Sequence, residues 1–161
     1  MRSRKLLTIF AEISFLKAVI VLIGLGVLAL CVFVLPAGIR SDQTGAYRPI
    51  LAGFYVPAIP FFVALYQALK LLGFIEKNKA FSEFSVSALK KIKYCALIIS
   101  VLFTVSMPYI FYVAELDDAP GVALIGFVII FASFVIGVFA AVLQKLIQNA
   151  VDIKSENDLT V

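Results

Sequence analysis

The sequence predicts an all-α membrane protein, an antiparallel bundle of four transmembrane helices with cytoplasmic helix extensions. The 161 residues are 63% hydrophobic and 15% charged, whereas soluble domains average about 45–50% apolar and about 25% charged residues. Four stretches without Asp, Glu, Lys or Arg have 21 to 26 residues each, and a helix needs roughly 20 to cross the hydrocarbon core. Because backbone groups in lipid must bond within their own segment, these crossings are expected to be helices.

The chain is short enough to form one domain, covering 1–161. The predicted spans are 16–38, 50–75, 84–114 and 119–149, followed by a cytoplasmic C-terminal tail at 150–161. A cleaved signal peptide is the alternative for the first span, because "MRSRK" precedes an apolar run. That run exceeds the usual 7–15 residues and "LPAG" is a poor cleavage site, so the first helix is expected to remain.

Several helix boundaries follow from the local sequence. The first helix is expected to begin before the bilayer, near Leu6, and to end at Pro36 and Gly38. The second is expected to run past the membrane to about Glu76. After the "KNKAF" turn, Ser82 is expected to be the N-cap of the third helix, because its hydroxyl can accept a bond from a free backbone N–H.

Lys and Arg predict the orientation. Twelve of the 14 such residues fall in segments 1–17, 70–93 and 145–161, and the other two are Arg40 and Arg48. The positive-inside rule therefore places both termini and the 70–93 loop in the cytoplasm. This distribution also explains the net charge of +4. The chain has no stripe of aromatic and basic residues of the kind that binds single strands, so no direct nucleic-acid binding is expected.

The fourth span contains a candidate packing surface. Ser133, Gly137 and Ala141 are spaced four residues apart, so they share one helical face. Small residues at this spacing allow another helix to approach closely. The alternative is chance spacing in a span rich in Gly and Ala.

The cytoplasmic hairpin contains an amphipathic segment. Phe84, Ala88, Ile92 and Cys95 fall on one helical face, with the neighbouring lysines turned elsewhere. Such a face is typical of a segment that lies on a membrane surface or contacts a partner. It is also typical of the water-exposed cytoplasmic end of a transmembrane helix.

The tail allows two interpretations as well. Leu143, Leu146 or Ile147, Ala150 and Ile153 continue the helical spacing beyond the fourth span. The last letters, "DLTV", have strand-like character, and an extended end could add to an exposed sheet edge or fit a groove in a partner. The alternative is a frayed C-terminus.

No catalytic residue, cofactor or metal site is predicted. The chain has no His, and its two cysteines, Cys31 and Cys95, differ in depth by roughly 20 Å at 1.5 Å per residue. The Cα limit for a disulfide is about 7 Å. No Cys, His and carboxylate cluster has zinc-ligand spacing, and the serines lack a credible base. The spans also lack the charged residue that usually marks a transport path, so transport is unsupported without being excluded.

Two cytoplasmic segments resemble a known family. The hairpin "LKLLGFIEKNKAFSEFSVSALKKIKYCALI" resembles a bacterial four-helix membrane family catalogued as domain of unknown function 2975. The matching hairpin residues are Phe81, Ser82, Val86, Leu89, Lys90 and Ile92. The matching tail residues, in "AVDIKSENDLTV", are Ala150, Ile153, Lys154, Glu156, Asn157, Asp158, Leu159 and Thr160. The hairpin departs at Ala80, where many relatives have Pro, and at 83–85, where an Asn-containing turn is usual.

The resemblance implies no established activity, but it implies a context. Relatives are often encoded beside a very small helix-turn-helix regulator of the Cro/C1 repressor type. The leading hypothesis is a non-enzymatic protein of the bacterial inner membrane that regulates or sequesters such a regulator. The candidate partner-binding residues are Phe81, Ser82, Leu89, Lys90, Glu156, Asn157, Asp158 and Leu159. The alternatives are a small transport or permeability module, as a homo-oligomer with a pore between subunits, and a membrane-stress or assembly factor.

Overall fold

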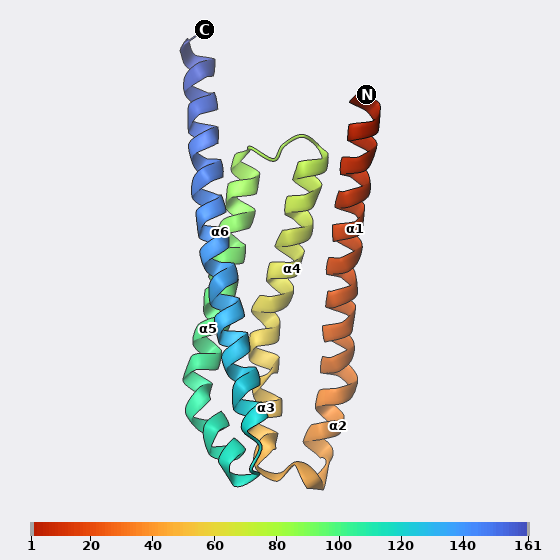
Figure 1. Ribbon diagram of the computed structural model, residues 1–161, viewed down its shortest axis with the longest axis vertical. Helices are drawn as coiled ribbons and strands as arrows, with labels where there is room; N and C mark the ends of the chain where they lie inside the picture. Colours follow the sequence, from red (N-terminus) through yellow and green to blue (C-terminus); the bar gives the residue numbers. More distant parts are fainter. Residues whose placement is uncertain (1, 161) are drawn as a thin grey trace.

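The computed structural model describes residues 2–160 of the chain (Figure 1). Its elements are α1 (Arg2–Ala29), η1 (Leu30–Val34), α2 (Leu35–Arg40), η2 (Asp42–Tyr47), α3 (Arg48–Gly53), α4 (Tyr55–Glu76), α5 (Glu83–Leu116) and α6 (Pro120–Thr160). Within the described part there is no strand, and four helical runs there are long and apolar enough to cross a membrane. The predicted all-α membrane fold is confirmed.

The two ends of the bundle differ in what they contain. Figure 1 shows the start of α1, the end of α6 and the α4–α5 turn at one end, which we call the hairpin end. The opposite end, which we call the far end, contains η2 and the α5–α6 loop. Each long helix runs in the direction opposite to the one before it (Figure 1).

Helix α5 lies between α4 and α6 and forms the core. Most of the buried residues belong to α5, including Val113, which has no exposed surface. On one side, the Phe54 and Phe103 rings meet edge to face with centroids 5.7 Å apart. On the other, the Ser100 hydroxyl donates a 3.3 Å hydrogen bond to the Ile130 carbonyl of α6. Lipid supplies no hydrophobic driving force between helices, so close packing and such bonds hold the bundle together.

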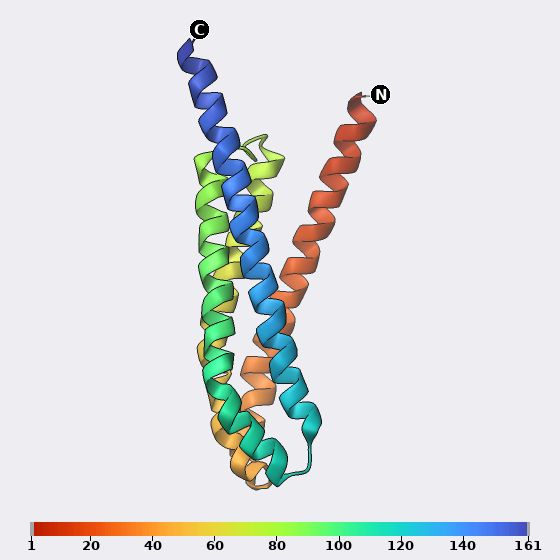
Figure 2. The same ribbon diagram turned by 60° about the vertical axis from the view of Figure 1, so that its left-hand side comes forward.

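Helix α1 is attached differently. It packs against α4, and its N-terminal half leans away from α6 and α5, as Figure 2 shows. A methyl group added at Gly24 would lie 3.4 Å from Leu65 of α4, so the two helices touch there. The fourth side of the bundle is therefore open toward the hairpin end.

The first helical run does not end at Pro36 and Gly38, contrary to the sequence-based expectation. It continues to Arg40 through the π-helical turn η1, in which the Leu35 N–H bonds to the Leu30 carbonyl. Proline has no N–H, and an α-helix tolerates one near the start of a new helical segment. The turn η1 supplies such a start, because it ends at Val34 and α2 begins at Leu35, which places Pro36 in the first turn of α2.

The far-end loops are tied to the bundle and to each other. The Tyr109 hydroxyl of α5 donates a 2.8 Å hydrogen bond to the Ala46 carbonyl in η2. Partial burial, with the hydrogen bond and negative charge of Asp117, raises the pKa of Tyr47 above its ordinary value of 10.0. Tyr47 thus joins the η2 loop to the α5–α6 loop.

Candidate functional site at the hairpin end

The turn between α4 and α5 is internally hydrogen-bonded. Asn78 adopts a left-handed conformation with φ 58°, which lets the Lys79 N–H bond to the Phe74 carbonyl at 2.8 Å and close α4. Ser82 is the N-cap of α5, as predicted, and its hydroxyl accepts a bond from the Ser85 N–H. The Ser82 hydroxyl also donates to the Lys79 carbonyl at 2.6 Å. The turn is a defined surface rather than a loose loop.

The four predicted hairpin contact residues lie in different environments. Phe81 is 63% exposed and Lys90 is also exposed, so both are accessible to a partner. Ser82 is already engaged as the cap of α5. Leu89 is only 3% exposed and packs inside the bundle, so a direct contact role does not fit it. Phe84, which was not among the candidates, is 61% exposed and lies 5.7 Å from the Phe74 ring.

The amphipathic face at the start of α5 mostly packs inside the bundle. Ala88 is 2% exposed and Cys95 is 8% exposed, while Ile92 is half-buried. Only Phe84 on this face is open to the surroundings. The arrangement favours the interpretation that this segment is the end of a transmembrane helix, and not a separate amphipathic segment on the membrane surface.

The tail is a projecting helix, not an extended strand. The sequence suggested strand-like character for "DLTV", but α6 continues without a break to Thr160. Within it, the Gln148 amide donates to the Asp152 carboxylate at 3.0 Å, a contact between residues one turn apart. A strand needs a neighbouring strand for its backbone groups, and none is available in the described chain, whereas a helix satisfies them internally. Val161 lies outside the described residues.

The predicted tail residues lie clear of the hairpin. Residues 152–159 are all exposed, and Figure 1 shows this part of α6 rising beyond the α4–α5 turn. Leu159 is 83% exposed and Ile153 is 60% exposed. The four tail candidates on this segment are Glu156, Asn157, Asp158 and Leu159. The structure thus brings hairpin and tail to one end of the molecule without packing one on the other.

A second projecting helix was missed as part of the candidate site. The first helix was expected to begin near Leu6, but α1 begins at Arg2, and residues 2–12 are all exposed. Leu7 is 69% exposed and Phe10 is 46% exposed. The signal was present in "LLTIFAEISFL", whose apolar residues continue the span toward the N-terminus. The hairpin end therefore offers two projecting helices with exposed apolar side chains, α1 and the end of α6.

Two polar contacts join the first helical run, α1 with η1, to α4. At the hairpin end, the Lys17 ammonium donates to the Glu76 carboxylate at 2.5 Å, with the side chains 32% and 27% exposed. Toward the far end, the Tyr55 hydroxyl donates to the Cys31 carbonyl at 2.8 Å. An exposed ion pair contributes only about 0–1 kcal/mol, so the partly shielded Lys17–Glu76 pair serves better as an orienting contact than as a source of stability.

The small residues of α6 lie at or beside its contact with α5. A methyl group added at Gly137 would lie 3.1 Å from Leu97 Cδ2, closer than ordinary van der Waals contact. Ser133 is 8% exposed, and its hydroxyl donates to the Ile129 carbonyl at 2.6 Å. Ala141 is half-buried, whereas its neighbour Ala140 is 4% exposed. Gly137 is therefore one of two close approaches of the helices; at the other, a methyl group added at Gly126 would lie 2.8 Å from Met107 Sδ of α5.

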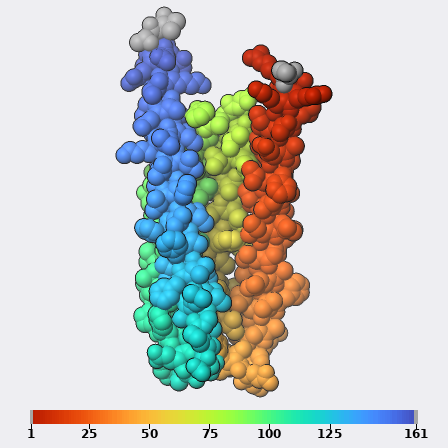
Figure 3. Space-filling model, viewed as in Figure 1, coloured from red at the N-terminus to blue at the C-terminus, as the bar shows by residue number. Residues whose placement is uncertain are grey.

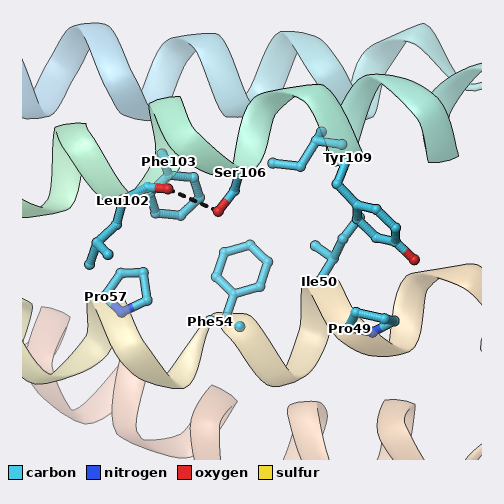
Figure 4. A pocket seen from close by; sticks show the side chains of 10 residues that line it. Pro49, Ile50, Phe54, Pro57, Leu102, Phe103, Ser106 and Tyr109 are labelled. Carbon is cyan, nitrogen blue, oxygen red and sulfur yellow. Dashed lines mark hydrogen bonds between the residues drawn. The ribbon is translucent and has the colours of Figure 1, made fainter.

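A small apolar pocket lies between α3–α4 and α5 near the far end (Figure 4). Its volume is about 130 Å³, below the roughly 300–1,000 Å³ of sites for small molecules. Ser106 and Tyr109 supply the hydroxyls of its lining. The Ser106 hydroxyl already donates to the Leu102 carbonyl at 2.9 Å, the dashed line in Figure 4, and the Tyr109 hydroxyl donates to the Ala46 carbonyl. Phe54 lines the pocket from the α3–α4 side and Tyr109 from the α5 side (Figure 4).

Over residues 2–160, no three His, Cys, Asp or Glu side chains are grouped so that they could hold a metal ion. The two cysteines are free thiols, in accordance with the predicted difference in depth. The described serine and threonine hydroxyls of the spans mostly bond to carbonyls one turn away, as in the Thr104 bond to Ser100.

Comparison with known proteins places the chain in a family. The family model described as "Protein of unknown function (DUF2975)" matches residues 5–161. The Bacillus subtilis (strain 168) protein called "Uncharacterized membrane protein YoaS" is 56% identical, with 91% of this chain and 96% of the relative covered. The search of solved structures gives no match. The resemblance carried by the hairpin and tail is confirmed: the chain belongs to the DUF2975 family of membrane proteins.

Proposed function

We propose that this chain is a non-enzymatic protein of the bacterial inner membrane that holds a small cytosolic helix-turn-helix regulator at its hairpin end. The observation that carries the proposal is the exposed apolar surface of α6 beyond the bundle. Ile153 is 60% exposed and Leu159 is 83% exposed, and both lie in the exposed segment 152–159 beyond the predicted span. Apolar side chains on a projecting helix are typical of helix-in-groove recognition.

The charge distribution supports a cytoplasmic hairpin end. The segments that contain 12 of the 14 Lys and Arg residues all lie at that end of the bundle, as the positive-inside rule requires of a cytoplasmic face. The exposed parts of α1 and α6 then stand in the cytosol. Exposed apolar patches in water usually mark interaction sites, and a cytosolic partner would cover this one.

The tail chemistry supports a protein partner over a lipid one. In the sequence Glu156–Leu159, two carboxylates stand within three residues of an exposed leucine. Anionic headgroups repel carboxylates, whereas a basic DNA-binding protein attracts them. The family resemblance supplies the class of partner, a small Cro/C1-type regulator.

The groups available for chemistry support a non-enzymatic role. The sequence has no His, and the described residues include no grouped metal ligands. A serine without a neighbouring base is a poor nucleophile. Transport is the less supported alternative, because all four spans lack the charged residues that usually mark an ion path.

The proposal is tested by binding a purified small Cro/C1-type helix-turn-helix regulator from the same bacterium to the full chain in lipid nanodiscs. Leu159→Asp removes an exposed apolar side chain, and Asp158→Asn is the matched control that removes only a charge. Burying a leucine contributes about 1.5–3 kcal/mol, so Leu159→Asp is expected to raise Kd by about tenfold or more. Asp158→Asn is expected to change Kd by less than about fivefold, since exposed charge pairs are weak. Equal Kd values for both variants and the wild type would contradict a role for the tail.

A further inference from the structure

A groove of about 550 Å³ runs along the open side of the bundle, between α1 and α6. All four long helices line it, through side chains such as Val27 of α1, Leu65 of α4, Ile99 of α5 and Ile136 of α6. Figure 3 shows the hollow between the α1 and α6 surfaces, with α4 visible behind them. The volume falls within the range of roughly 300–1,000 Å³ found for ligand pockets.

The walls of the groove select an apolar occupant. Of the described residues that line it, only Ser133 carries an oxygen or nitrogen atom in its side chain. That hydroxyl already donates to the Ile129 carbonyl, so it offers no free donor. A polar ligand would lose its hydration here without compensation, at a cost of several kcal/mol per group.

The position of the groove along the helices indicates that the hydrocarbon core of the bilayer surrounds it. Its lining residues, apart from Ile92, all lie within the four charge-free stretches that match the hydrocarbon core. An empty groove would leave the lining atoms without contact partners and forfeit their dispersion energy. At this depth the bilayer supplies acyl chains, which fit both the shape and the apolar walls.

The lysines at the hairpin end favour a lipid with an anionic headgroup. Each charge-free stretch is flanked at that end by a lysine, and these are Lys17, Lys70, Lys93 and Lys145. Lys17 is paired with Glu76, so the other three are the lysines that can attract a headgroup. The divergence of α1 also makes the open side widest toward this end (Figure 2). Lysines near the membrane surface attract anionic lipids. We propose that the groove is a binding site for one acyl chain of an anionic phospholipid, which enters from the leaflet at the hairpin end.

The site is independent of the regulator, because it lies inside the bilayer and the proposed regulator contacts lie outside. An acyl chain in the groove would fill the gap between α1 and α6. The lipid would thereby complete the bundle on the side that the protein leaves open. Helix α1 packs against α4, and its N-terminal half leans away from α6 (Figure 2). An acyl chain between α1 and α6 is therefore expected to restrict the tilt of α1.

The absence of tryptophan from the sequence allows a clean test. Ile136→Trp places a single fluorophore on the rim of the groove, where Ile136 is 54% exposed. Val138→Trp is the matched control on the same helix, 45% exposed and outside the groove lining. Both full-length variants are reconstituted in vesicles of dioleoyl phosphatidylcholine with increasing fractions of dioleoyl phosphatidylglycerol, and each lipid in turn carries brominated chains that quench tryptophan.

The expected result is a relative association constant, phosphatidylglycerol over phosphatidylcholine, of about 5 at position 136, the factor that one lysine near the surface provides. The value at position 138 is expected to stay near 1. Ala64→Phe, added to Ile136→Trp, fills the groove and is expected to lower the constant to the control value. Ala132→Phe, on the exposed rim, serves the same purpose if Ala64→Phe lowers thermal stability.

Two results would overturn the proposal. Equal constants at positions 136 and 138 would show that the groove contains ordinary bulk lipid. Protection of Ile136→Trp from both brominated lipids would show that a second copy of the chain or another helix covers the groove.

Discussion

The Tyr55 hydroxyl lies 2.8 Å from the Cys31 carbonyl oxygen and donates a hydrogen bond to it. This carbonyl has lost its usual partner, because the Leu35 N–H bonds to Leu30 in the π-helical turn. In the π register the next donor would be the N–H of Pro36, which proline does not have. One tyrosine of α4 thus compensates the backbone of the first helical run at the residue where it changes register.

Tyr55→Phe is expected to destabilise the bundle by about 1–2 kcal/mol, because it leaves a carbonyl in lipid without a donor. The measurement is thermal denaturation of the purified full chain in detergent. Tyr112→Phe is the control, since Tyr112 is 56% exposed and its hydroxyl makes no hydrogen bond within the described chain. Equal midpoints for the two variants would show that water or lipid satisfies the Cys31 carbonyl instead.

Gly137→Leu is expected to destabilise the contact between α5 and α6. A Cβ there would already be 3.1 Å from Leu97 Cδ2, and overpacking of this kind costs about 1–3 kcal/mol. Val138→Leu, at a 45% exposed neighbour, is expected to be nearly neutral. Denaturation in detergent compares the two, and equal tolerance would remove Gly137 from the contact.

Gln144→Met is expected to stabilise the protein by about 1 kcal/mol. The Gln144 Oε1 atom is buried and has no hydrogen-bond donor among residues 2–160, and a buried unsatisfied acceptor costs about 1–3 kcal/mol. Gln148→Met is the comparison, because Gln148 makes an exposed bond to Asp152 and its loss is expected to matter little. A lower denaturation midpoint for Gln144→Met would mean that Oε1 has a donor in the membrane.

Reporter fusions test the orientation that the lysines predict. A reporter after Val161 is expected to read cytoplasmic, and one inserted within 41–47 is expected to read external. The opposite pattern would place the hairpin end outside and would contradict both the regulator proposal and the direction of lipid entry.

Composition and charge spacing were enough to predict the four helices, since charge-free length alone separates membrane spans from loops. Ser82 could be predicted as a cap because the capping chemistry is local. Pro36 could not be placed correctly, because its tolerance depends on a π-helical turn and on Tyr55, 19 residues further along the chain.

The candidate site was predictable only in part. The sequence located the hairpin and the tail, but helical periodicity could not show that Leu89 faces the core while Phe84 faces outward. The helical state of the last residues depends on the uninterrupted run of α6, whereas local β-propensity favoured a strand. The apolar groove depends on the tilt of α1 relative to α6, a tertiary feature that no local pattern encodes.

Retention of the proposed regulator at the membrane is tested most directly by fractionating cells of the source bacterium that express a small Cro/C1-type helix-turn-helix protein at its native level. With the full-length chain present, the regulator is expected mainly in the membrane fraction. With the chain cut after Ser155, or with Leu159→Asp, it is expected to shift to the cytosol while the membrane protein stays at wild-type abundance. A regulator that partitions identically with the full chain, with the truncated chain and without the chain would contradict the proposed function.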